Sequence, residues 1–153
     1  MAIDVTERLK EPSIWYVKSD DLERCWPVVA AAYLDFPGLE EFFTLEELSE
    51  KLFQNPNFNV WLYMDKGVVE GYMITKLRRD KRKTSLHIVG CAGKDIIRKY
   101  LPTTMESLEQ YAAMIGADEV TLEGRPGWEK VMKRYGYQRV LKMTKDVTVR
   151  WRN

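Results

Sequence analysis

The sequence predicts an α+β domain built on one mixed β-sheet. Three observations point to this fold class. Segments with a helical period of hydrophobic residues lie on both sides of the middle of the chain. Three consecutive strand-like segments, joined by short turns, occupy that middle. A further strand-like segment follows a helix, which favours a right-handed parallel crossover to the sheet.

The first third of the chain contains one predicted strand and two predicted helices. They are a strand at 14–17, a helix from Asp20 to about Pro37, and a helix from Thr44 to the residue before Pro56. Each helix begins with a capping-box pattern, in which an acidic residue follows the cap by three positions: Asp20 with Glu23, and Thr44 with Glu47. Hydrophobic residues then recur every three or four positions, as on one face of an amphipathic helix.

The middle of the chain is predicted to form an antiparallel meander with strands at 60–64, 68–77 and 84–89. Asp65-Lys66-Gly67 has the composition of a tight hairpin turn. Gly71 interrupts the second strand and indicates a bulge or a close backbone approach. The basic run 78–83 forms the tip of the second hairpin, where charge protects a strand edge.

The last third alternates helices and strands. After the small residues at 90–93, a helix with a capping box at Thr103 and Glu106 runs to Gly116. The remaining predicted elements are a strand at 119–123, a helix at 127–135 closed by Gly136, and a strand at 137–150.

Composition limits the classes of protein that fit. The chain has 153 residues, 45% hydrophobic and 31% charged, which excludes wholesale disorder and predicts a single domain over 1–153 with a flexible arm at 1–12. A net charge of +1 argues against nucleic-acid and membrane-surface partners. Two cysteines and one histidine exclude a disulfide framework and a Cys/His zinc site, so no metal is expected. The sequence shows neither a signal peptide nor a transmembrane span, and predicts a soluble protein of a reducing compartment.

The element order resembles that of the GCN5-related N-acetyltransferases (GNAT family) from about residue 14 onward. More narrowly, the chain is similar to small acetyltransferase-like proteins of tailed bacteriophages. That similarity is carried by Glu-Gln-Tyr-Ala at 109–112, Gly-Ala at 116–117, Gly-Arg-Pro-Gly-Trp at 124–128 and Tyr-Gly-Tyr at 135–137. The resemblance implies a GNAT-like fold with helices on both faces of the sheet, acetyl-coenzyme A as cofactor and an amine as acceptor. It also implies a location in the cytoplasm of a bacterial host, or in a virion.

In that family, a Gln or Arg, two residues, Gly, one residue and Gly or Ala form the cofactor loop. Here the best register gives His87, Gly90 and Ala92, which matches the two small positions and not the first. We expect the cofactor to be bound by Gly90, Cys91, Ala92, Gly93 and Lys94, with the backbone N–H groups of 91–94 at the pyrophosphate. The opening for the pantetheine arm would lie between the third meander strand and the fifth strand. The alternative is an ordinary turn between a strand and a helix, in which Cys91 is a small packing residue rather than a nucleophile.

The catalytic positions match the family less well. In the register fixed by Gly136-Tyr137, Met132 stands where a tyrosine often acts as general acid, and methionine has no proton to donate. A general base is still needed, and the candidates are His87 and Glu123. The alternatives are a structural histidine and a Glu123–Arg125 ion pair.

Arg125 and Trp128 are candidates for binding the acceptor substrate; Trp128 can equally serve to pack the last helix on the sheet. Two functions fit these observations. The first is an enzyme that transfers acetyl from acetyl-coenzyme A to an amine by direct attack. The second is a catalytically degenerate phage protein that acts as a virion structural or host-interaction module, with a phage or host protein as its partner. The small residues at 90, 92 and 93 favour the first function, and Met132 favours the second.

Overall fold

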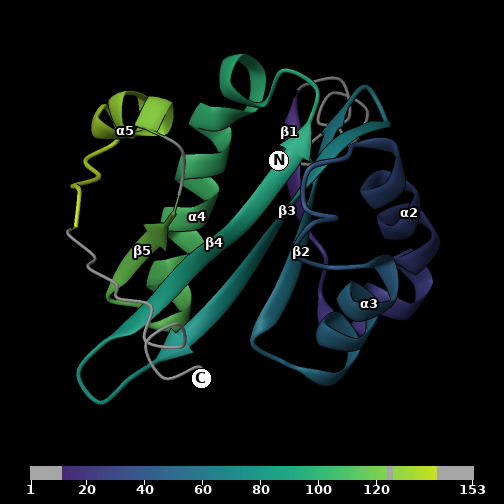
Figure 1. Ribbon diagram of the computed structural model, residues 1–153, viewed down its shortest axis with the longest axis horizontal. Helices are drawn as coiled ribbons and strands as arrows, with labels where there is room; N and C mark the ends of the chain where they lie inside the picture. The colour runs from purple at the N-terminus through teal and green to yellow at the C-terminus, as the bar shows by residue number, and fades with distance from the viewer. Residues whose placement is uncertain (1–11, 124–125, 141–153) are drawn as a thin grey trace, which may run out of the picture. The chain divides into compact units, whose positions relative to one another are not determined.

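A five-stranded sheet in the order β1-β2-β3-β4-β5 forms the centre of the protein in the computed structural model, which describes residues 12–123 and 126–140 (Figure 1). The strands are β1 (Ser13–Tyr16), β2 (Phe58–Asp65), β3 (Val68–Arg79), β4 (Thr84–Gly93) and β5 (Glu119–Leu122). The helices are η1 (Ser19–Asp21), α2 (Leu22–Asp35), α3 (Leu45–Gln54), η2 (Ile96–Tyr100), α4 (Leu101–Ile115) and α5 (Pro126–Lys133).

The sheet is mixed, as the sequence predicts. The first four strands pair antiparallel in chain order, and β4 pairs with β5 in parallel. The parallel pair needs a crossover because β4 and β5 run in the same direction, and α4 supplies it. The predicted α+β class and the order of its elements are therefore confirmed.

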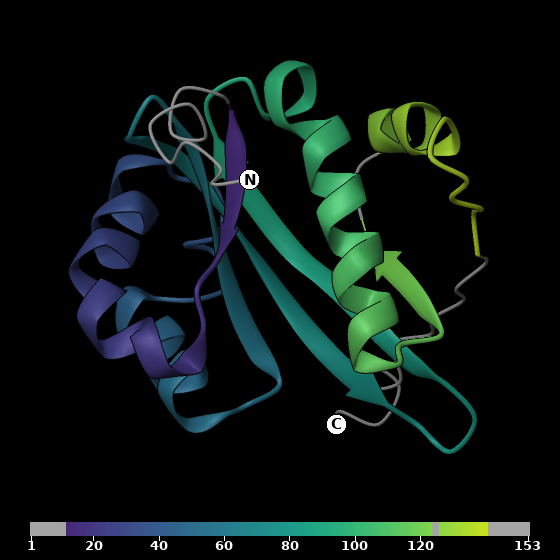
Figure 2. The same ribbon diagram turned by 180° about the vertical axis from the view of Figure 1, so that it is seen from behind.

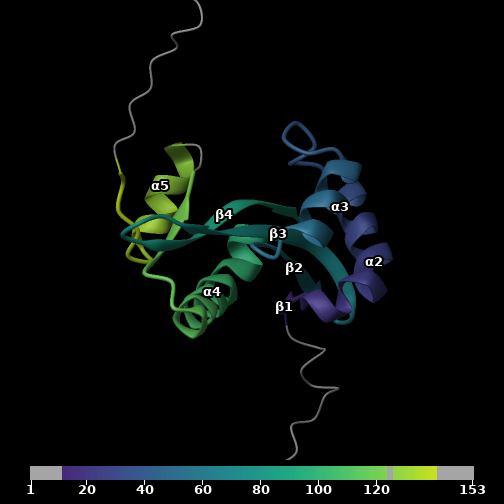
Figure 3. The same ribbon diagram turned by 90° about the horizontal axis from the view of Figure 1, so that it is seen from below.

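Helices cover both faces of this sheet. α2 packs on β3 and α3 on β2, whereas α4 packs on the opposite face, against β1 and β5. Figure 2 shows α4 lying across the back of the sheet, and in Figure 3 α3 and α4 lie on opposite sides of it. Alternate residues of the central strands consequently face two different cores.

The core under α4 is aromatic. The rings of Tyr16 and Trp61 have centroids 4.9 Å apart, and Tyr111 of α4 lies 5.2 Å from Trp61. The Trp61 indole N–H, which is buried, donates to the Thr75 hydroxyl at 3.0 Å. These contacts fix α4 on the sheet and satisfy the polar atoms that its packing buries.

One of the three predicted capping boxes is confirmed. Thr44 accepts from the Glu47 N–H at 3.1 Å, and the Glu47 side chain accepts from the Thr44 N–H. The box at Asp20 is wrong, because Asp20 lies in the 3₁₀ turn η1 and Asp21, which makes no side-chain cap, precedes α2. The box at Thr103 is also wrong. α4 begins earlier, at Leu101, since proline is well tolerated in the first turn of a helix and Pro102 occupies it.

The β2–β3 turn and Gly71 are as predicted. Lys66 and Gly67 have φ values of 53° and 78°, the left-handed conformation of a tight hairpin turn. The register shifts between Tyr63 and Met64, so β3 is bulged just before Gly71. A Cβ atom on Gly71 would lie 2.5 Å from the backbone oxygen of Ala92, so this position requires glycine.

The chain divides into two compact units, Met1–Glu123 and Gly124–Asn153. The second contains α5, after which Gly136 has a φ of 85°, as expected for the residue that closes a helix. The predicted last strand is not present at 137–140, and its residues 141–150 lie outside the described part of the chain, as does the predicted arm apart from Pro12. No helix in the described residues is long and apolar enough to cross a membrane.

Candidate active site

β4 extends four residues beyond its predicted end, and this changes the expected cofactor loop. Gly90, Cys91, Ala92 and Gly93 belong to the strand, so the interpretation of these residues as a turn that opens directly into a helix is wrong. A bulge in β4 interrupts the alternating pattern by which a strand is recognised in the sequence. Ile74 pairs with Gly90 while Thr75 pairs with Ile88, so Val89 is an extra residue that breaks the alternating pattern.

The bulge lies where β4 and β5 separate. The two strands pair from Ser85 with Glu119 to Ile88 with Leu122, and there β5 ends. β4 continues to Gly93, well past the tip of β5 in Figure 1. Among the described residues, no strand pairs with this last stretch of β4 on its β5 side. This unpaired edge lies where the sequence predicts the opening for the cofactor.

The register determines which backbone groups this edge presents. Lys94 donates its N–H to Glu70 at 2.8 Å, which makes Glu70 and Lys94 a hydrogen-bonded pair of the β3–β4 ladder. Because such pairs alternate along an antiparallel ladder, the N–H groups of Cys91 and Gly93 point away from β3, toward the unpaired edge. The expectation that four consecutive N–H groups face a ligand is therefore wrong for Lys94 and Ala92, whose groups face β3.

Gly90 and Ala92 lie on the face that carries α2 and α3, beneath the loop between these helices. A Cβ atom on Gly90 would lie 2.5 Å from Leu39 Cδ2, and one on Gly38 would lie 2.9 Å from Ala92 Cβ. Leu39 is itself buried. The small residues of β4 therefore allow the close approach of this loop, a reason for their size that the sequence alone does not reveal.

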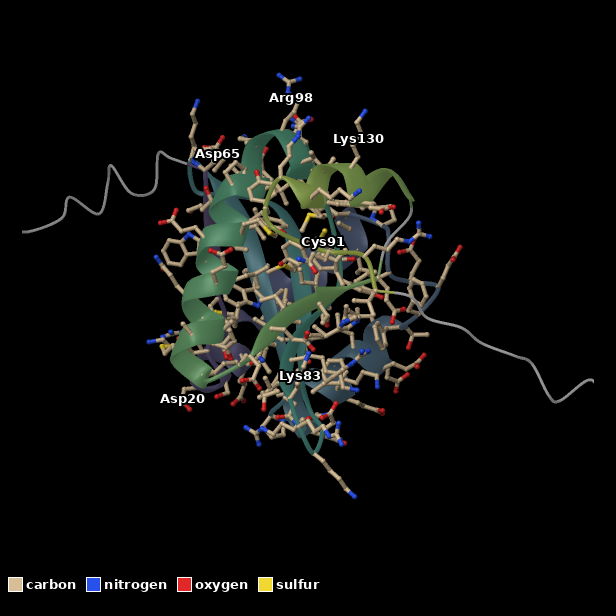
Figure 4. All side chains as sticks on the ribbon, turned by 90° about the vertical axis from the view of Figure 1, so that its left-hand side faces the viewer. Asp20, Asp65, Lys83, Cys91, Arg98 and Lys130 are labelled. Carbon is tan, nitrogen blue, oxygen red and sulfur yellow. The ribbon has the colours of Figure 1, made fainter. Side chains whose placement is uncertain are left out.

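Cys91 points to the opposite face. It pairs with Met73, which pairs with Trp61 under α4, and it is half-buried, whereas Arg98 projects outward in Figure 4. Burial raises the pKa of the Cys91 thiol to about 11. The thiol is therefore protonated at neutral pH, which agrees with a packing residue and not with a nucleophile.

His87 and Thr121 face each other across β4 and β5. The His87 Nδ1 atom lies 2.8 Å from the Thr121 hydroxyl oxygen, and the histidine side chain is buried. Burial lowers the pKa of His87 below its ordinary value of 6.5. The positive charges of Arg78 and Lys76 lower this pKa further, and the negative charge of Glu123 opposes them. The imidazole is therefore neutral at pH 7, and the carboxylate of Glu123 lies close enough to influence it.

We predict that the pKa of His87, measured from the imidazole resonances in a pH series by NMR, lies below 6.5. His87 is the single histidine of the chain, so the assignment is unambiguous. Since the folded pKa is lowered, the unfolded chain binds the proton first, and the free energy of unfolding should decrease as the pH falls through about 6.5. Lys76→Met should raise the pKa because it removes a nearby cation. A folded-state pKa above 6.5 would contradict the buried, cation-flanked position of the imidazole.

The two candidate acceptor-binding residues lie beyond this unit. Trp128 is in α5 of the second unit together with Met132, and Arg125 lies outside the described residues. Their roles stay predictions.

Sequence reasoning missed one residue of the site, Thr121. Thr121 carries a readable signal, because Glu119, Thr121 and Glu123 alternate with two apolar residues and so share the face of one strand. Among the described residues, no three His, Cys, Asp or Glu side chains form a group that could hold a metal ion.

Comparison with solved structures identifies the architecture. The model matches a GNAT family acetyltransferase of Staphylococcus aureus with a TM-score of 0.59 and 14% identity, over 89% of this chain and 98% of that one. It matches glucosamine-6-phosphate N-acetyltransferase from Arabidopsis thaliana with a TM-score of 0.58 and 14% identity, over 90% and 99% of the two chains. This chain has the GNAT fold. A further match is AAC(6')-Iy in complex with the bisubstrate analogue CoA-S-monomethyl-acetylneamine, with a TM-score of 0.61 and 16% identity over 90% and 99% of the chains.

No family model and no curated protein sequence matches the chain. At identities of 10–16%, the structural matches show the fold. The GNAT-like architecture that the sequence predicts is thereby confirmed, with its mixed sheet and helices on both faces.

Proposed function

We propose that this protein is an acetyl-coenzyme A-dependent N-acetyltransferase whose reaction takes place where β4 and β5 separate. The observation that carries the proposal is the unpaired edge of β4 from Val89 to Gly93 beside the His87–Thr121 pair. The AAC(6')-Iy match was solved with a coenzyme A-based bisubstrate analogue, which supports a cofactor of this kind for the fold.

The unpaired edge supplies what the pantetheine arm of the cofactor needs. The arm contains two amides, and an amide that lies along a strand edge can exchange hydrogen bonds with backbone N–H and C=O groups. The Cys91 and Gly93 N–H groups are available for this on the β5 side of β4. Lys94 adds a positive charge near the end of this edge.

In the reaction, the lone pair of an uncharged amine attacks the thioester carbonyl carbon. The C–N bond forms, the C–S bond breaks, and coenzyme A leaves as a thiolate that takes up a proton from solvent. The base removes one proton from the amine nitrogen. His87 suits this role because it is neutral at pH 7, and a proton on Nδ1 shared with Thr121 leaves Nε2 to accept another. Glu123 is the other candidate, acting directly or through water.

Acetyl-coenzyme A should bind to the native protein in calorimetry and raise its melting temperature, because a ligand of the folded state alone stabilises it. Cys91→Pro removes one N–H from the unpaired edge without removing a β3–β4 ladder bond, so it should weaken binding by about tenfold or more. Cys91→Ala is the matched control, since it loses the same side chain and keeps the N–H. It should bind like the wild type.

If millimolar acetyl-coenzyme A gives neither heat nor a thermal shift with the wild-type protein, the enzyme proposal is wrong. Equal weakening in Cys91→Pro and Cys91→Ala would show that the cofactor does not use this edge. Binding without acetyl transfer to any amine would favour the alternative, a catalytically degenerate module. Met132 in place of the expected tyrosine is the observation behind that alternative, and Met132→Tyr would then test it.

The similarity to tailed-phage proteins and the virion location remain predictions of the sequence. Mass spectrometry of purified phage particles would detect the protein if it is packaged in the virion.

A further inference from the structure

A row of four residues crosses the α2/α3 face of the sheet and ends at the proposed base. Phe58 pairs with Lys76, Lys76 with His87, and His87 with Thr121. Directly paired residues point to the same face, with Cβ atoms about 5 Å apart. The Lys76 side chain is therefore the immediate neighbour of the His87 imidazole on the side away from β5.

A second lysine reaches the same row from α3. The Nζ atom of Lys51 lies 5.1 Å from the centre of the Phe58 ring, and that of Lys76 lies 5.3 Å from it. Lys51 is also 5.4 Å from the centre of the Phe43 ring. Two ammonium groups thus share one aromatic ring, although like charges repel each other. We call Lys51, Lys76 and Phe58 the lysine pair site.

Neither lysine has a counter-ion in the described part of the chain. The ion pairs there involve Arg24, Lys83, Lys99, Lys133 and Arg139, and not Lys51 or Lys76. Arg78, two residues farther along β3, likewise has none. The ring attracts each cation by only on the order of 1 kcal/mol, which leaves most of their charge uncompensated. An anion that contacts both ammonium groups would compensate both charges.

We propose that the lysine pair site holds the phosphate group of a phosphorylated amine acceptor and places its amine at His87. A phosphate ester carries a charge between −1.5 and −2 at neutral pH, which matches two ammonium groups better than a single carboxylate does. The proposal rests on the proposed acetyltransferase function, because it names the class of acceptor. It also predicts that polycationic amines are poor acceptors, since the two lysines repel them.

The first test uses inorganic phosphate and needs no activity. Phosphate should bind saturably and raise the pKa of His87 in NMR, relative to sodium chloride at the same ionic strength, because a nearby anion favours the charged imidazole. The double variant Lys51→Met/Lys76→Met keeps the aliphatic packing on Phe58 and should weaken phosphate binding by about tenfold or more. Lys81→Met removes the same charge from the β3–β4 hairpin tip and should leave the binding unchanged.

The second test compares acceptors. With acetyl-coenzyme A, glucosamine 6-phosphate should be acetylated more efficiently than glucosamine. The double variant should abolish this preference when both proteins are assayed at a pH above the pKa of His87. A neutral or polycationic amine preferred over the phosphorylated one would overturn the proposal.

The two tests separate the two proposals. If phosphate leaves the His87 resonances unchanged, or binds equally well to the double variant, the proposed phosphate binding at the lysine pair site is wrong. This conclusion does not depend on whether the protein transfers acetyl groups. If phosphate binds there and no amine is acetylated, the anion site stands and the acetyltransferase function fails.

Discussion

We expect Gly90→Val to lower the free energy of unfolding by about 3 kcal/mol, the upper end of the usual cost of overpacking a core. The added Cβ would lie 2.5 Å from Leu39 Cδ2 and 3.1 Å from Cδ1, and the Leu39 side chain is buried in the core between the sheet and α2 and α3. Urea or thermal unfolding measures the loss. Because the collision is with Leu39, this variant disturbs the fold, and it cannot serve as a clean block of cofactor binding.

A double-mutant cycle identifies the cause. Leu39→Ala alone should lower the free energy of unfolding, because it empties a buried leucine site. In the double variant it also removes the atoms that the valine would meet. The loss of stability in the double variant should therefore be smaller than the sum of the two single losses. Gly71→Ala is the matched control, because its Cβ would meet backbone atoms of Ala92 and Gly93. Leu39→Ala should not rescue it. Strict additivity of Leu39→Ala and Gly90→Val would show that the α2–α3 loop does not rest on Gly90.

His87→Gln should reduce kcat for acetyl transfer by about 10²–10⁴-fold, the usual contribution of a general base. Glutamine can keep the hydrogen bond to Thr121 but cannot accept a proton from the amine. The melting temperature and the affinity for acetyl-coenzyme A should change little, so the loss appears in the chemical step. In the wild type, the rate should rise with pH through the lowered pKa of His87 and then level off.

Glu123→Gln is the isosteric comparison for the other candidate base. It removes one carboxylate charge beside His87, so it should lower the pKa of the histidine further and shift the pH profile to lower pH, with a smaller change in the maximal rate. A large loss in Glu123→Gln together with a small one in His87→Gln would assign the base to Glu123 instead.

The sequence by itself determined the order and type of the strands β1–β5 and of the helices α2–α5, because these depend on local patterns. The period of hydrophobic residues, the capping box at Thr44 and the Asp65-Lys66-Gly67 turn each act over a few neighbouring residues. The element order that these patterns give, with the parallel crossover, resembles that of the GNAT family, and this resemblance implies the GNAT-like fold. The two false capping boxes, at Asp20 and Thr103, show the limit: neighbouring turns and Pro102 decide where a helix starts.

Only the tertiary structure decided how the candidate site is arranged, because its geometry depends on pairing between distant strands. β4 continues past the bulge at Val89 as far as Gly93. The β3–β4 register determines which backbone N–H groups face the unpaired edge. The registers of the β2–β3, β3–β4 and β4–β5 pairs together align Phe58, Lys76, His87 and Thr121, residues that are up to 63 positions apart in the sequence. A register shift of one residue in any of these strand pairs would turn the side chains of the shifted strand to the other face of the sheet. The row of residues therefore exists only in the folded sheet.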